Sequence, residues 1–189
     1  VVYRNHTGVQ CNSSVGVGYG HVWRVTVGGV VGEWSTVSTS YTPASVSSFV
    51  NATSLRTEGG DVVQLLGRNF GPTSATLRVV YRNAPYGVEY LAASCYVTGS
   101  GHTSANCTSV PGVGGGLQWR VEVGGQNGSW SVATTTYMSP TLTSIPLGID
   151  TRGGAVVIGG TSFGTVNEIS AGLTIVSYWS PTANQGGIG

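Results

Sequence analysis

Apolar and polar residues alternate along much of this chain, which is typical of strands that bury one face. The alternation is clear in residues 118–123 and recurs in 21–27 and 77–82. Residues 62–66 and 155–158 form short, mostly apolar runs. No segment has a convincing 3.6-residue period. The pattern predicts an all-β chain whose short strands form an antiparallel sandwich.

The pattern also repeats along the chain. Cys11 and Cys107 lie in similar surroundings 96 residues apart. The same offset joins Gly16-Val17-Gly18 to Gly112-Val113-Gly114, Trp23 to Trp119, Gly28-Gly29 to Gly124-Gly125, Trp34 to Trp130 and Tyr41 to Tyr137. Downstream, Thr57-Glu58-Gly59-Gly60 matches Thr151-Arg152-Gly153-Gly154, and Phe70-Gly71 matches Phe163-Gly164. A unit of the size of a small domain therefore recurs, and each glycine pair is expected to form a tight hairpin turn with positive φ.

The repeat divides the chain into three parts. Pro43 and Pro140 follow the matching tyrosines, and a proline at such a point marks a boundary between units. The expected parts are the C-terminal half of a unit (residues 1–42), a complete unit (43–139) and the N-terminal half of a unit (140–189). The linkers are only a few residues long, so neighbouring units should hold a fixed relative orientation.

The order of these motifs resembles the IPT/TIG domain, the immunoglobulin-like fold of plexins, related receptors and some transcription factors. The residues that carry the resemblance are Thr57-Glu58-Gly59-Gly60, Leu66 to Gly71, Cys95 with Cys107, Val110-Pro111-Gly112 and Val121 to Gly125. In the last unit the motif degrades to Gly160 to Gly164. The resemblance implies tandem β-sandwiches, one complete and two half domains, used for adhesion, recognition or spacing. It does not imply catalysis.

The cysteines suggest one disulfide. Cys95 and Cys107 enclose eleven residues, and a bond closing this hairpin fits both the geometry of disulfides and the family pattern. Two reduced, buried cysteines are the alternative. Cys11 matches Cys107, and its counterpart of Cys95 would precede Val1, so Cys11 is expected to be free or paired with another chain.

The chain carries five N-x-Ser/Thr sequons, which are acceptors for covalent N-glycans if it passes through a eukaryotic secretory pathway. The asparagines are Asn5, Asn12, Asn51, Asn106 and Asn127. Asn51 and Asn127 lie in expected turns and rank highest, whereas Asn106 lies beside the expected disulfide and ranks lowest. Together with the cysteines, the sequons favour an extracellular location, either secreted or at the cell surface.

Charge and chemistry exclude several functions. Only 8% of residues are charged, the net charge is +1 and all eight basic residues are arginine, which argues against a nucleic-acid partner. No apolar run is long enough for direct membrane insertion. The few carboxylates show no paired spacing, and the glycine-rich residues 112–116 lack a following lysine and helix. We therefore expect a protein that is not an enzyme, with no catalytic residues, metal or cofactor.

The tryptophans fall into two classes. Trp23 and Trp119 are expected to fill the sandwich core. Trp34 and Trp130 follow the glycine-pair turns and are the candidates for an exposed aromatic surface that stacks on sugars or buries at a protein interface. Packing in the core or at a sheet edge is the alternative for both.

The two expected half units suggest a function. The first hypothesis is a structural protein that assembles with itself, head to tail, by completing half domains into a filament. The second is a fragment of a multi-domain cell-surface receptor or adhesion protein. The third is a carbohydrate-binding accessory module, which should lose glycan binding when Trp34 or Trp130 is replaced.

Overall fold

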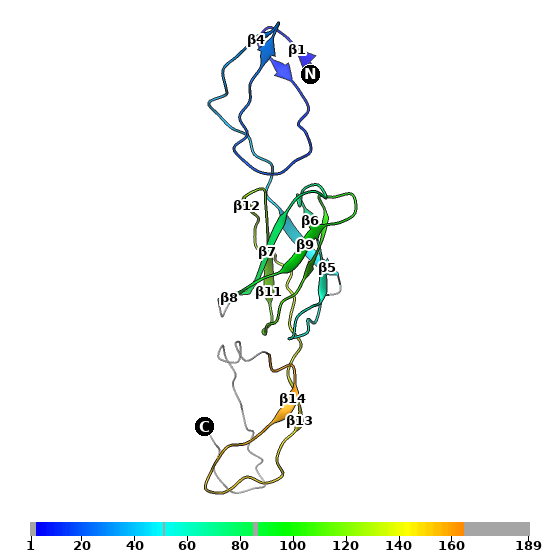
Figure 1. The fold of residues 1–189 in the computed structure, drawn as a ribbon, viewed down its shortest axis with the longest axis vertical. Helices are drawn as coiled ribbons and strands as arrows, with labels where there is room; N and C mark the ends of the chain where they lie inside the picture. The colour runs from blue at the N-terminus through cyan, green and yellow to red at the C-terminus, as the bar shows by residue number, and fades with distance from the viewer. Residues whose placement is uncertain (1–2, 51, 85–86, 165–189) are drawn as a thin grey trace.

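The computed structural model describes residues 3–50, 52–84 and 87–164. Every regular element in these residues is a strand, and all the strands pair antiparallel. Figure 1 shows the strands in three groups, one after another along the long axis of the molecule. We refer to residues 3–42, 43–139 and 140–164 as the N-terminal, central and C-terminal parts. The all-β prediction is confirmed.

The central part contains two four-stranded antiparallel sheets. One has the order β5 (Ser45–Val50), β6 (Val62–Arg68), β10 (Ser104–Thr108), β9 (Ala93–Val97). The other has the order β12 (Gln126–Asn127), β11 (Leu117–Val123), β7 (Leu77–Asn83), β8 (Val88–Leu91). Burial alternates along the whole of β11, as its sequence pattern predicts. The two sheets enclose one apolar core, which gives a sandwich-like arrangement.

Aromatic side chains from different strands meet in this core. The Tyr81 ring stacks on the Trp119 ring with centroids 4.2 Å apart, and both residues are fully buried. The Trp119 indole Nε1 donates a hydrogen bond to Thr135 Oγ1 at 2.9 Å, and the Tyr81 and Tyr137 hydroxyls lie 2.7 Å apart. The buried polar atoms of these rings are thereby satisfied, as a stable core requires.

The outer parts contain shorter strands. They are β1 (Tyr3–Arg4), β2 (Val9–Gln10), β3 (Thr26–Val27), β4 (Val30–Val31), β13 (Thr141–Ser144) and β14 (Gly159–Thr161). The β13–β14 pair repeats the β5–β6 pair in register. Thr141 pairs with Thr161 as Ser45 pairs with Arg68. The C-terminal part therefore begins in the same way as the central part.

Two expected strands differ in the structure. The strand expected over residues 21–27 is reduced to Thr26–Val27, with one isolated bridge between His21 and Thr39. The matching strand β11 pairs with β7 over its full length, but no described strand takes the place of β7 beside residues 21–27. Likewise, residues 155–158 form no strand. Their counterparts at the start of β6 pair with β10, and the C-terminal part has no described counterpart of β10.

The turns that link these strands agree with the sequence. All four glycines of the two matching pairs, Gly28, Gly29, Gly124 and Gly125, have positive φ. Each pair connects a two-stranded hairpin, β3 to β4 and β11 to β12. A side chain is disfavoured at these angles, so glycine is the residue that such turns require.

The predicted disulfide between Cys95 and Cys107 is present, joining β9 to β10 with the two Cα atoms 4.2 Å apart. We expect replacement of both cysteines by alanine to lower the free energy of unfolding by about 2–3 kcal/mol, because the unfolded chain gains conformational freedom. Urea unfolding monitored by tryptophan fluorescence measures this loss. Cys11→Ala is the control, since Cys11 is exposed and forms no disulfide in the structure. An equal loss in the control would contradict the prediction.

Candidate assembly surfaces

The N-terminal part exposes apolar residues whose counterparts form the core of the central part. Three apolar side chains of residues 23–27 face solvent, although the matching side chains on β11 are buried. Trp23, Val25 and Val27 are 45%, 52% and 63% exposed, and the matching Trp119, Val121 and Val123 are 0%, 1% and 3% exposed. The same sequence pattern is therefore covered in one part and uncovered in the other.

The local structure around the exposed tryptophan is nevertheless that of the central part. Three hydrogen bonds are repeated at matching positions. Trp23 Nε1 donates to Thr39 Oγ1 at 2.8 Å, Trp23 N donates to Ser35 Oγ at 3.0 Å and the Tyr41 hydroxyl donates to Ser14 O at 2.6 Å. The central bonds are Trp119 to Thr135, Trp119 to Ser131 and Tyr137 to Val110. The N-terminal part thus repeats the local hydrogen bonding of the central part.

A groove of about 430 Å³ lies beside this apolar face, and Trp23 and Tyr41 line it. In the central part, the space between the matching Trp119 and Tyr137 is occupied by Tyr81 of β7, whose ring stacks on Trp119 and whose hydroxyl lies beside that of Tyr137. The groove is therefore where a strand equivalent to β7 would pack.

The C-terminal part exposes apolar residues that match the core residues of β5 and β6. Val156 and Leu142 are exposed, whereas the matching Val63 and Val46 of the central part are buried. The β13–β14 strand pair, which includes Leu142, has the same register as the β5–β6 pair. A Cβ placed on Gly67 would meet Phe70 and the Ser45 carbonyl, and one placed on Gly160 would meet Phe163 and the Thr141 carbonyl. The described residues of the C-terminal part thus form a strand pair like β5–β6, and Leu142 and Val156 are exposed.

The contacts between successive parts are also repeated. Val17 of the N-terminal part lies against Gly71, and the matching Val113 of the central part lies against Gly164. Both glycines have positive φ, 88° and 85°. Gln126 adds a hydrogen bond from its side-chain Nε2 to Tyr41 O at 3.1 Å across the first junction. Similar contacts at both junctions indicate a regular spacing of units.

The second pair of tryptophans packs against arginine. The Arg24 guanidinium lies 4.6 Å from the centroid of the Trp34 ring. Arg82 and Arg120 lie 4.0 and 4.4 Å from that of Trp130. Such cation–π contacts stabilise by about 0.5–1 kcal/mol at exposed sites. A sugar that stacked on Trp130 would compete with these guanidinium groups. The sequence contained a signal for the Trp130 contacts, because Arg82 and Arg120 lie on the polar side of the expected strands 77–82 and 118–123.

The glycan candidates and Cys11 differ in their exposure. Asn5, Asn12 and Asn127 are exposed, and Asn127 belongs to the short strand β12 rather than to a turn. Asn106 is half-buried and its side chain donates a hydrogen bond to the Tyr96 hydroxyl at 3.4 Å. Asn51 lies outside the described residues. Cys11 is exposed, one residue after β2.

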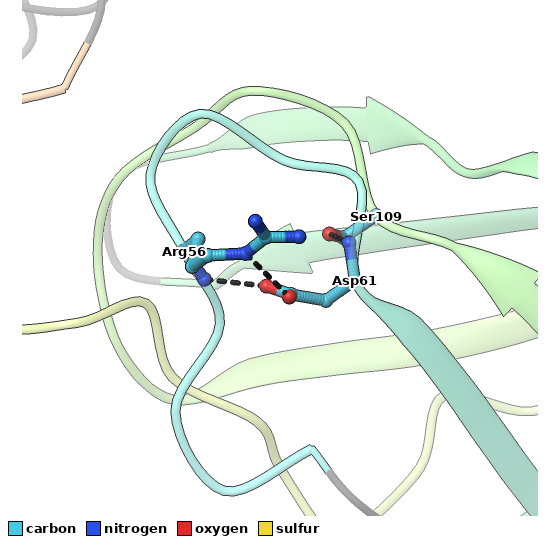
Figure 2. Close-up of polar contacts among 3 residues, drawn as sticks. All are labelled: Arg56, Asp61 and Ser109. Carbon is cyan, nitrogen blue, oxygen red and sulfur yellow. Dashed lines mark hydrogen bonds and ion pairs between the residues drawn. The ribbon is translucent and has the colours of Figure 1, made fainter.

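Two arginine–aspartate pairs form ion pairs within single loops. In Figure 2, the Asp61 carboxylate accepts hydrogen bonds from Arg56 N at 2.6 Å and Arg56 Nε at 2.8 Å, and Asp61 N donates to Ser109 Oγ at 3.0 Å. These bonds hold residues 56–61, the loop that precedes β6, against Ser109. In the C-terminal part, hydrogen bonds from the Arg152 side chain and backbone lower the pKa of Asp150.

No cluster of three metal-ligating side chains occurs among the described residues. The same residues contain no helix that is long and apolar enough to cross a membrane. The functional candidates are the two exposed apolar faces described above, one on residues 23–27 and the other around Leu142 and Val156.

Comparison with known proteins gives no outside reference for these faces. A scan against protein-family models found no match, and neither did a search of curated proteins nor a search of solved structures. The internal repeat is consequently the reference against which the two faces are compared.

Proposed function

We propose that this chain is a non-enzymatic extracellular structural protein whose molecules join head to tail into a filament. Each junction completes one IPT/TIG-like, immunoglobulin-like sandwich from residues 140–189 of one molecule and residues 1–42 of the next. The observation that carries the proposal is the exposure of Trp23 at a position where Trp119 is fully buried.

Burial of apolar surface supplies the driving force. Complete burial of one valine or leucine side chain stabilises by about 1.5–3 kcal/mol, and each face presents several such side chains. Open strand edges add unpaired backbone groups that a second chain satisfies by strand addition. An uncovered half sandwich is aggregation-prone in isolation, so a specific partner has a clear physical role.

Head-to-tail geometry follows from the difference between the two faces. One face comes from the counterparts of β10, β11 and β12, and the other from those of β5 and β6. A contact between unlike surfaces leaves one surface of each kind free after every addition, so growth continues unless a ring closes. The repeated Val17–Gly71 and Val113–Gly164 contacts favour a straight succession of units.

A disulfide and five sequons support the proposed extracellular location. The Cys95–Cys107 disulfide is of a kind that persists in oxidising compartments. Five sequons provide acceptors for covalent N-glycans, which would help to keep a weakly charged surface soluble. The partners of the proposed protein are thus further copies of itself and its own glycans.

A fragment of a multi-domain receptor or adhesion protein is the second candidate, since the missing halves would then lie on the same polypeptide. Electron microscopy of the native material, combined with intact mass after denaturation and removal of glycans, decides between the two. The proposal expects filaments made of chains of about 19.3 kDa. Isolated particles, or a much longer polypeptide, would overturn it in favour of the fragment.

A further inference from the structure

We infer the register in which the two chains pair, an inference that rests on the proposed function. The β2 edge of one molecule lies antiparallel to the segment leading into β14 of its neighbour, with Val9 opposite Ile158 and Cys11 opposite Val156. The occupant of each uncovered face is therefore a second copy of this chain, held in one defined alignment.

The central part shows how the two edges meet. There, β10 pairs with β6 with Ala105 opposite Leu65 and Cys107 opposite Val63. The 96-residue offset that joins Cys11 to Cys107 also joins Val9 to Ala105. Val9 belongs to β2, which pairs only with β1 among the described strands. Cys11 and Val9 therefore take the places of Cys107 and Ala105.

The C-terminal part fixes the other side of the pair. The β13–β14 register sets Gly160 in the place of Gly67 and Thr161 in the place of Arg68. The offset falls from 94 residues at Gly60 and Gly154 (154 − 60) to 93 at Gly67 and Gly160 (160 − 67), so one residue is lost between these points. We place that loss ahead of Val156, which sets Ile158 in the place of Leu65 and Val156 in the place of Val63. The segment is open on this side, because β14 pairs only with β13 among the described strands.

The exposure of the side chains agrees with this alignment. Val157 is 85% exposed, Val156 is 41% exposed and Ile158 is partly covered. In the central part the counterparts of Val156 and Ile158 are buried, and that of Val157 is the polar Gln64. A slip of one residue would turn Val157 toward the core and its neighbours outward.

The register is tested with an engineered disulfide. Residues directly opposite in an antiparallel pair have Cα atoms about 4.5–5.5 Å apart, which lies within the range that a disulfide bridges. We expect V156C filaments, after mild oxidation, to give a ladder of covalent multimers on a non-reducing denaturing gel. Reduction and the C11S/V156C double variant should both remove the ladder.

V157C is the matched control, because its thiol should lie on the opposite side of the strand and give no ladder. A second pair, V9C/I158C in a C11S background, keeps the test decisive if V156C fails to assemble. Filaments without a ladder in both pairs would overturn the register and leave the proposed function standing. A ladder from V157C alone would overturn it in favour of a one-residue slip. Absence of filaments from the unmodified protein would overturn the proposed function itself.

Discussion

Replacing Trp119 by alanine is expected to destabilise the central sandwich strongly, whereas replacing the matching Trp23 is expected to leave the free chain as stable as before and to weaken assembly. Trp119 is fully buried and stacked on Tyr81, and removal of such a side chain costs about 3–5 kcal/mol. Trp23 is nearly half exposed. Under the proposal, Trp23 becomes a buried core residue only when a neighbouring molecule covers it.

Two measurements separate these effects. Urea unfolding at a concentration below that needed for assembly gives the stability of the free chain. Light scattering against concentration then gives the strength of association. For W23A we expect a loss of about 2 kcal/mol of burial at the junction, which corresponds to roughly thirtyfold weaker association. A stability loss in W23A as large as that in W119A would show that residues 23–27 are already part of a closed core, and would contradict the proposal.

Alternation along the sequence predicts which side of a strand is apolar but not whether a partner strand exists. Residues 118–123 and 21–27 carry the same pattern, yet only the first forms a full strand, because β7 lies beside it. The same reason accounts for residues 155–158, whose counterparts need β10. The sequence thus predicted the all-β fold, the turns and the disulfide, while strand lengths depended on pairing between distant segments.

The tryptophans show the same limit at the level of side chains. Trp23 and Trp119 could not be told apart from the sequence, since both begin the same apolar face and both donate an indole hydrogen bond to a threonine. In the central part Tyr81 and Phe49 pack against the Trp119 ring, and both are far from Trp119 in sequence. The arginine contacts to Trp34 and Trp130 were missed, although polar-side arginines on neighbouring strands are a readable signal.

Mixing two variants that are blocked on opposite faces is expected to give a dimer in place of a filament. V25D places a carboxylate in the N-terminal face and V156D places one in the C-terminal face. Burial of an unpaired carboxylate costs several kcal/mol, so neither variant should form filaments alone. Each variant keeps one working face of the opposite kind. An equal mixture should therefore give a one-to-one dimer, which analytical ultracentrifugation detects at twice the mass of the chain.

V132D is the matched control, because Val132 belongs to the central part and is 96% exposed. It should assemble as the unmodified protein does. The dimer of the mixture distinguishes a contact between unlike faces from a symmetric one. If like faces paired, each variant would form dimers by itself through its intact face, and mixing would change nothing. If both variants grew filaments alone, neither face would be the site of assembly, and the uncovered core residues would need another explanation.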